Sequence, residues 1–406
     1  MRAAEKTKPD MGAGDLWRAY PQTIKQLRDR AAPDRRRLAD IRGHPGGSEA
    51  DLGPSMRTLL IGNMTFFHVG AFFRNALQAL DQPHVAMDQS AYDQIAWPPI
   101  VRKVAFRLMG GRPFGYWRFN RDILSAARDL GPEMVLVTGA ACVAASTLRE
   151  LKEQTGAVLV NYATDDPFNR LTCPPWVAAN IPLYDLYACT KRAIMDDVRA
   201  AGCRQVAFVP FGYEPSLHFP DSFESAEEFG KFSCDVVFVG GADRDRYPYF
   251  EALVRAVPDL HLNLYGGYWD RNPVLAPYHR GFALGRDYRL ALEGAKIAPC
   301  LVRRANRDGH VMRSFEVPAC RAFMLAERTR DHQEFFREGE EVGYFSSAEE
   351  LVEKVGYYLN HDNERQRMAE AAYRKVTSGN YTYSHRLQQI LELAAPLALH
   401  LKRPTQ

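Results

Sequence analysis

Short apolar runs alternate with longer amphipathic segments from residue 58 onward. Continuous apolar runs bounded by turn residues are typical of buried parallel strands. In the first half of the chain they lie at residues 58–62, 134–138, 157–162, 186–190 and 206–210. The segments between them, such as 146–155 and 191–201, have the periodicity of the helices that must connect parallel strands. This pattern predicts a doubly wound, Rossmann-like α/β domain over residues 56–212.

A second series of apolar runs follows a stretch that lacks this pattern. Residues 213–233 combine Pro215, Pro220 and scattered acidic and aromatic residues, which indicates a linker. Strands are then expected at 235–240, 260–266, 297–301, 322–326 and 342–345. We therefore predict a second Rossmann-like domain over residues 234–380, and a helical segment at 381–406 with a helix at 385–401. Two such domains would face each other across a cleft, with a ligand between the carboxyl ends of their strands.

Composition and charge narrow the class of protein. The chain has 406 residues, 46% hydrophobic and 25% charged, which is enough for two globular cores. The chain contains 52 Lys and Arg residues and 49 Asp and Glu residues. Residues 1–55 contain 11 of the basic and 8 of the acidic residues, so residues 56–406 contain 41 of each. A neutral body disfavours a nucleic-acid partner. Residues 1–55 are rich in Arg, Asp, Pro and Gly and are expected to be a disordered extension, either a solvated tail or a basic arm.

The cysteine pattern and the length of the apolar stretches indicate the cellular compartment in which the protein is expected. The seven cysteines form no C-x-x-C pair and no Cys/His cluster with zinc spacing, which favours a reducing compartment. The longest apolar stretch, residues 134–146, is too short to cross a bilayer, and the N-terminus lacks the apolar core of a secretory signal. We therefore expect a cytoplasmic protein without a transmembrane segment.

The segment 306–320, between two expected strands, carries the clearest candidate chemistry. Because Pro318 cannot donate a backbone hydrogen bond, a helix there should begin near Arg313 or Ser314, with Ser314 as a candidate N-cap. Free N–H groups at a helix start, together with the Arg313 guanidinium, suit a diphosphate, and Glu316 suits a pair of ribose hydroxyls. The alternative is an ordinary first helical turn in which an acidic residue is favourable for dipole reasons alone.

Two local patterns in this segment resemble a known family. The spacing Asp308-x7-Glu316 resembles the E-x7-E signature of retaining GT-B glycosyltransferases. The run RSFEVPAC at 313–320 is similar to the CgeB-like branch of that group, which is named for a spore maturation protein. The resemblance extends over about residues 58–390 and is strongest in the second half. Two positions depart from the pattern: Asp308 is one methylene shorter than the usual Glu, and Arg321 replaces a Gly.

The resemblance implies the GT-B architecture and a hexosyltransferase-type activity. The expected reaction moves a sugar from a nucleotide-diphosphate donor to an unidentified glycan, protein or small-molecule acceptor. The E-x7-E likeness suggests retention of configuration, and the nucleotide sugar would be a co-substrate, with no metal and no other cofactor. Asp308 would contact the sugar, Arg313 the leaving diphosphate and Glu316 the ribose, with Gly309, His310 and Ser314 also on the donor side. A surface position is the alternative for His310.

The turn after residues 235–240 is a second candidate donor contact. Gly240 and Gly241 permit close approach of a ligand, and the resemblance places a basic residue just beyond the turn against the diphosphate, for which we favour Arg244 over Arg246. The alternative is glycines that serve only the turn, with solvated arginines. The run Asp243-Arg244-Asp245 also matches a D-x-D metal motif, a short pattern that arises readily by chance.

Candidate acceptor-side residues follow strands of the first domain. Asp165 and Asp166 lie after residues 157–162, where one of two adjacent carboxylates could act as a general base or bind the acceptor. A turn before Pro167 is the alternative. Gly62, Asn63 and His68 follow the first strand and would line the acceptor side, although the nearby aromatic run is expected to be core.

Two other functions remain open at this point. A sugar-nucleotide epimerase on the same scaffold would use the donor cleft without an acceptor. A catalytically weak binding or surface-assembly protein is the other alternative, which the short Asp308 and the substituted glycine keep open. No P-loop, nucleophile-elbow or zincin motif occurs, and the first strand lacks the glycine fingerprint of dinucleotide binding.

Overall fold

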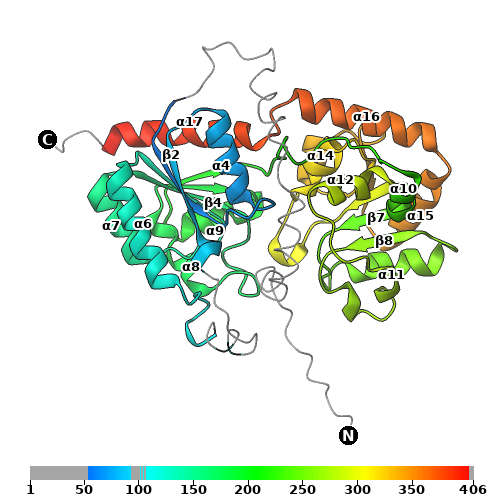
Figure 1. Ribbon diagram of the computed structural model, residues 1–406, viewed down its shortest axis with the longest axis horizontal. Coiled ribbons are helices and arrows are strands. Elements are labelled where there is room, and N and C mark those ends of the chain that lie inside the picture. Colours follow the sequence, from blue (N-terminus) through cyan, green and yellow to red (C-terminus); the bar gives the residue numbers. More distant parts are fainter. Residues whose placement is uncertain (1–53, 93–100, 102–103, 105–106, 402–406) are drawn as a thin grey trace, which may run out of the picture.

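The computed structural model describes residues 54–92, 101, 104 and 107–401. These residues form two α/β domains that lie side by side (Figure 1). The expected N-terminal extension falls almost entirely outside the described residues. No helix in the described part of the chain combines the length and the apolar character needed to cross a membrane.

The first domain is a six-stranded parallel sheet in the order β2-β1-β3-β4-β5-β6. Its strands are β1 (Thr58–Gly62), β2 (His84–Asp88), β3 (Met134–Thr138), β4 (Val158–Ala163), β5 (Leu186–Cys189) and β6 (Gln205–Phe208). The surrounding helices are α4 (Val69–Ala79), α6 (Tyr116–Leu130), α7 (Ala145–Thr155), α8 (Pro175–Ala179) and α9 (Met195–Ala200). Strands β1, β3 and β4 are buried at every position because helices cover both faces. Gly131 and Gly156 end α6 and α7 in the left-handed conformation that glycine adopts without strain.

The second domain is a five-stranded parallel sheet in the order β11-β10-β9-β7-β8. Its strands are β7 (Cys234–Val239), β8 (Leu262–Tyr265), β9 (Ala295–Cys300), β10 (Met324–Glu327) and β11 (Gly343–Phe345). Its helices are α10 (Ala226–Phe232), α11 (Tyr247–Ala256), α12 (Arg286–Glu293), α13 (Arg313–Ala319), α14 (Arg330–Phe335), α15 (Ala348–Leu359) and α16 (Asp362–Ser378). Both sheets reverse their order next to the first strand, between β1 and β3 and between β7 and β9. In open parallel sheets, ligands bind at the carboxyl side of this switch point.

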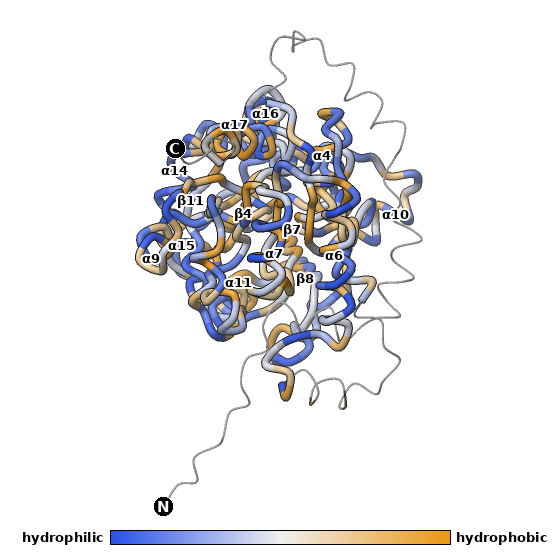
Figure 2. Tube along the Cα trace, turned by 90° about the vertical axis from the view of Figure 1, so that its left-hand side faces the viewer, coloured by the Kyte–Doolittle hydropathy of each residue, from blue (hydrophilic) through white to orange (hydrophobic). Residues whose placement is uncertain are grey.

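Within the described residues, the chain crosses between the domains twice. The chain passes forward near Tyr213 and returns near Thr382, and these two segments pair as a short parallel bridge. The returning chain forms α17 (Tyr383–Leu401), which lies over the first domain rather than the second (Figure 1). Tyr383 packs against Phe72 and Phe73 of α4, and a single hydrophobic cluster continues from the first domain into the second. The hydrophobic strands lie inside the molecule, beneath helices with more polar outer faces (Figure 2).

All ten strands expected from the apolar runs are present, with ends shifted by a few residues. Two elements were not expected. β2 is an edge strand whose residues are all half-buried, so it carries no continuous apolar run. α10 lies inside the expected linker 213–233, where the Ser225 hydroxyl caps it by accepting a hydrogen bond from the Glu228 amide (3.1 Å).

Candidate functional site

Two arginines from different elements meet at the switch point of the second domain. Arg246, at the start of α11, and Arg313, at the start of α13, both lie over the ring of Phe238 in β7, at 5.2 and 5.0 Å from its centroid. Gly240 follows β7 beneath them, where an added Cβ would come within 3.0 Å of Arg313 Nη1. Gly240 therefore leaves room for the Arg313 guanidinium, which a larger residue at position 240 would crowd.

The charges around these arginines are not balanced. Arg246 is only 5% exposed, and the Nε atoms of Arg246 and Arg313 are buried without a hydrogen-bond partner among the described residues. Burial lowers the pKa of Arg246 to about 10, with Asp243 opposing the change and Arg313 and Arg303 adding to it. Asp243 is the nearby carboxylate, 3.5 Å from Arg246 Nε and 3.6 Å from Arg303 Nε. Arg303 also lies 3.8 Å from Asp165, so three guanidinium groups share two nearby carboxylates, and the end of β7 is electropositive.

In the loop after β7, Arg244 and Arg246 have different surroundings. Arg244 is exposed, whereas Arg246 reaches back and donates to the Gly241 carbonyl. The two acids of the D-x-D pattern have different surroundings, because Asp243 faces the arginines and Asp245 accepts from the Ala305 amide at 3.4 Å. In the described part of the chain, no three His, Cys, Asp or Glu side chains are grouped so as to hold a metal ion.

Glu316 lies at the other end of α13's first turn and is enclosed by protein. Its Oε2 accepts a hydrogen bond from the Tyr288 hydroxyl (3.0 Å), and its Oε1 lies 3.6 Å from Nε2 of His218. Burial raises the pKa of Glu316 to about 7, although Arg313 and the Tyr288 hydrogen bond act in the opposite direction. The carboxyl group therefore changes charge near neutral pH.

The start of α13 differs from the expectation. The helix begins at Arg313 with Met312 at the N-cap position, so Ser314 is not the N-cap. Ser314 is fully buried, and its hydroxyl accepts from the Val311 amide (3.0 Å) and contacts Nε2 of His332 (2.8 Å). The first amides of the helix also have partners, because those of residues 314, 315 and 316 donate to carbonyl oxygens of residues 311 and 312. The guanidinium of Arg313, rather than these amides, is thus the group that can meet an anion here.

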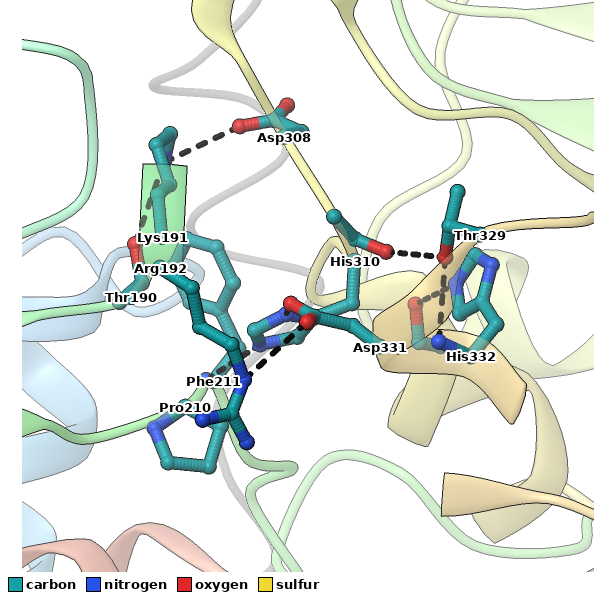
Figure 3. A network of polar contacts seen from close by, with 12 residues as sticks. Thr190, Lys191, Arg192, Pro210, Phe211, Asp308, His310, Thr329, Asp331 and His332 are labelled. Carbon is teal, nitrogen blue, oxygen red and sulfur yellow. Dashed lines mark hydrogen bonds and ion pairs between the residues drawn. The ribbon is translucent and has the colours of Figure 1, made fainter. Parts of the chain in front are cut away.

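Asp308 is held by the first domain. Lys191, which follows β5, forms an ion pair with Asp308 Oδ1 at 3.0 Å, and both side chains are almost fully buried (Figure 3). The Lys191 ammonium also donates to the Thr164 carbonyl (2.7 Å) and to the Thr190 hydroxyl (3.1 Å), so its three protons all have acceptors. Burial raises the pKa of Asp308, with Lys191 opposing the change. The loop that carries the E-x7-E-like spacing is therefore docked across the domain interface.

His310 is fully buried, so the surface position weighed for it is wrong. The Phe211 amide donates to Nε2 at 3.1 Å, which leaves the ring proton on Nδ1 to donate to Asp331 at 2.9 Å (Figure 3). Burial lowers the pKa of His310, with Asp331 acting in the opposite direction. Both ring nitrogens are thus used inside the protein. Gly309, the residue before His310, packs against Asp331, and an added Cβ at Gly309 would lie 2.4 Å from the Asp331 carboxylate.

The adjacent acids after β4 face the second domain in different ways. Asp166 is buried and receives two hydrogen bonds from Arg307, at 2.7 and 3.0 Å. Its backbone amide donates to the side chain of Asn306 at 2.8 Å. Asp165 is half-buried and lies 3.8 Å from Arg303. Asp166 therefore joins the domains, and Asp165 is the more accessible carboxylate of the pair.

The first strand's residues lie at the same edge of the first domain. Asn63 accepts from the Thr65 amide at 2.9 Å, and Gly62 packs so closely on Thr138 that an added Cβ would lie 2.0 Å from its hydroxyl. His68 is the N-cap residue of α4, and burial lowers its pKa to about 4 against the effect of Asp88 and Asp165. His68 is accordingly neutral at physiological pH.

Several of these residues were not identified from the sequence. Lys191, His218 and Tyr288 reach the site from β5, the linker and α12, which are distant in sequence. Lys191 directly follows the strand expected at 186–190, and this position at a carboxyl end of the sheet could have indicated that it belongs to the site. Lys296 lies away from this site, because it pairs with Asp235 at the amino ends of β7 and β9 (2.8 Å).

Comparisons with known proteins address the fold and the second half of the chain. Residues 245–392 match the model of a family described as glycosyl transferase-like. Among curated proteins no sequence matches significantly. Sucrose-phosphate synthase from Thermosynechococcus elongatus superposes with a TM-score of 0.60 at 13% identity, over 85% of this chain and 99% of its own. HepE from Anabaena, in complex with UDP-glucose, superposes with a TM-score of 0.54 at 12% identity, over 85% of this chain and 100% of its own.

The fold is GT-B. The N-terminal domain of a trehalose-6-phosphate phosphatase from Candida albicans gives a further likeness, with a TM-score of 0.58 at 12% identity over 89% of this chain and 99% of its own. The expectation of two doubly wound domains is confirmed, and the CgeB-like branch stays a prediction. In the GT-B arrangement of this chain, the arginine site, Glu316 and the loop of Asp308 all lie at the carboxyl edge of the second sheet, toward the first domain.

Proposed function

We propose that this chain is a glycosyltransferase that binds the diphosphate of a nucleotide sugar at Arg246, Arg313 and Arg303. The observation that carries this proposal is the pair of guanidinium groups over Phe238 whose buried Nε atoms have no hydrogen-bond partner among the described residues, with Asp243 as an ion-pair partner of Arg246 at 3.5 Å. Buried donors of this kind are costly when unpaired, and guanidinium groups match phosphate oxygens in bidentate geometry. A diphosphate would supply the missing acceptors.

The remaining roles follow from position around this site. Glu316 would accept hydrogen bonds from the ribose hydroxyls, and these bonds are stronger when the carboxyl group is ionised. Arg313 and Arg246 would stabilise the charge that grows on the leaving diphosphate, and this proposal needs no metal ion. Asp308 is not free to approach a sugar while Lys191 holds it, so its contact with the donor would require the interface to loosen. Asp165 and His68 are the proposed acceptor-side groups.

The neighbours suggest the first donor to try. HepE was solved with UDP-glucose, so we propose a uridine diphosphate sugar as the initial candidate. Thermal unfolding of the full chain in EDTA should show stabilisation by UDP-sugars, because a ligand that binds only the folded state raises its apparent stability. The same measurement with GDP-, TDP- and ADP-sugars ranks the bases.

The arginine site provides a sharper test. Arg313→Met and Arg246→Lys should abolish or greatly reduce this stabilisation by nucleotide. Because Arg313 lies beside the like charges of Arg246 and Arg303, the unfolding temperature of the ligand-free Arg313→Met protein should be unchanged or higher. Arg244→Ala is the matched control, because it lies in the same loop and is exposed.

Three outcomes would count against the proposal. Equal nucleotide binding in Arg313→Met and wild type would remove the arginine site. Binding that EDTA abolishes and manganese restores would return Asp243 and Asp245 as metal ligands. Conversion of a UDP-sugar to a new nucleotide sugar, without any acceptor, would favour an epimerase.

A further inference from the structure

Exposed apolar side chains gather in the segment that precedes α6. Of the eleven large apolar side chains that are well exposed among the described residues, five lie between residues 101 and 117. They are Val101 (42%), Val104 (53%), Leu108 (83%), Phe114 (56%) and Trp117 (72%). Isolated exposed apolar residues are ordinary, whereas a group of them indicates a surface that binds something.

The same stretch holds a concentration of positive charge. Residues 94–121 contain six basic residues and no acidic one: Arg102, Lys103, Arg107, Arg112, Arg118 and Arg121. Residues 56–406 contain 41 basic and 41 acidic residues, so the part of this range outside residues 94–121 contains 35 basic and 41 acidic residues. Asp122 offsets part of this charge, because it lies 3.7 Å from Arg118 and 3.0 Å from Arg121. This segment therefore has a net positive charge, whereas the rest of residues 56–406 has a net negative charge.

The apolar and basic side chains are arranged on one projecting part of the first domain. Val101, Val104 and Leu108 are helical, and their spacing of three and four residues puts them on one helix face. Trp117 lies in the first turn of α6, and this region projects from the first domain on the side opposite α17 (Figure 1). It follows the carboxyl end of β2, which is the sheet edge that also carries Asn63 and Asp165.

We propose that Val101, Val104, Arg107, Leu108, Arg112 and Trp117 form a surface that docks the first domain onto an anionic lipid bilayer. Aliphatic and indole side chains insert at the level of the headgroups, and arginines beside them contact lipid phosphates. A nucleic acid would satisfy the arginines and leave Val104 and Leu108 without apolar contacts, so lipid suits the combination better. Docking here would bring the acceptor side of the GT-B cleft to the membrane surface.

Vesicle co-sedimentation of the full chain tests this surface without any nucleotide sugar, so its result is independent of the proposed transferase activity. The protein should pellet with vesicles of phosphatidylcholine and phosphatidylglycerol much more than with phosphatidylcholine alone, and high salt should weaken the binding. Arg107→Gln and Arg112→Gln should each reduce affinity by about fivefold. Leu108→Ser combined with Trp117→Ser should reduce it further, and all four positions are exposed or half-buried, so folding should be preserved.

Matched controls come from exposed residues elsewhere. Leu399→Ser in α17 and Arg204→Gln at the amino end of β6 should bind like wild type. Failure of the wild-type chain to pellet with anionic vesicles would overturn the proposal. So would unchanged binding in the Leu108 and Trp117 variant, or a preference for a DNA or RNA oligonucleotide over vesicles at equal phosphate concentration.

Discussion

Glu316 is a carboxyl group enclosed by protein, and its charge state therefore controls part of the stability of the fold. Burial raises its pKa from 4.5 to about 7. Between these values the folded state keeps the proton that the unfolded state has released. The stabilisation from this difference is complete below pH 4.5 and is lost as the pH rises to about 7.

Glu316→Gln should remove that loss. We predict that the variant is more stable than wild type at about pH 8, by on the order of 2 kcal/mol, with the difference shrinking toward pH 5. Glutamine keeps an oxygen that can accept from Tyr288. Urea unfolding across this pH range measures the effect, and Glu340→Gln, at an exposed site, should show no such trend. Parallel curves for wild type and Glu316→Gln at every pH would show that Glu316 is not held neutral by burial.

The two segments that connect the domains meet at Gly212, where a larger residue would not fit. Gly212 lies where the outgoing chain meets the returning chain, and the Tyr213 amide donates to the Tyr381 carbonyl at 3.0 Å. A Cβ added at Gly212 would lie 2.7 Å from that same carbonyl oxygen. Because the obstacle is backbone, the two segments would have to separate.

Two glycine substitutions should therefore have opposite effects. We predict that Gly212→Ala lowers the free energy of unfolding by about 1–3 kcal/mol, as overpacking does. Gly230 lies inside α10 with open space around it, so Gly230→Ala should raise the free energy of unfolding by about 1 kcal/mol. Thermal unfolding of both variants checks this. A Gly212→Ala protein as stable as wild type would mean that the crossings are not closely packed.

The elements also show what a sequence can and cannot reveal. The ten expected strands were predictable because each contains a short apolar run, and most of these runs are buried in the sheets. β2 was not predicted because its sequence His-Val-Ala-Met-Asp has only three apolar residues between polar ends and is half-buried throughout. α10 was hidden by the linker composition, although Ser225 followed by Glu228 has the spacing of a helix N-cap.

At the scale of the whole molecule, the site is built from contacts that no local pattern contains. Arg313 and Glu316 could be identified because they share one short segment. The partner of Asp308 could not, since Lys191 meets it only when the two domains pack together. The burial of His310 has the same origin, because its Nε2 partner is a backbone amide from the end of the first domain.

The ion pairs across the interface hold the domains together before any ligand binds. Arg307 is central among them, because it donates to Asp166 at 2.7 and 3.0 Å and to Asp197 at 2.6 Å. Arg192 adds contacts to Asp331 at 3.3 Å and to Glu334 at 2.8 Å. Removing Arg307 leaves Asp166 buried without its counterion, and such losses cost several kcal/mol when both groups are buried. Arg307 is partly exposed, so we expect a smaller cost, on the order of 2 kcal/mol.

This cost should appear as a change in domain arrangement. We predict that Arg307→Ala has a larger radius of gyration than wild type in small-angle X-ray scattering, and is cleaved faster by protease near residues 209–225. Each domain should keep its secondary structure by circular dichroism, because the side-chain hydrogen bonds of Arg307 go to Asp166, Ala193 and Asp197 across the interface. Arg199→Ala, which removes an exposed ion pair inside α9, is the matched control and should scatter like wild type. If Arg307→Ala and wild type give the same scattering at low and high salt, the closed arrangement depends on the shared hydrophobic cluster beneath α17 and not on these charges.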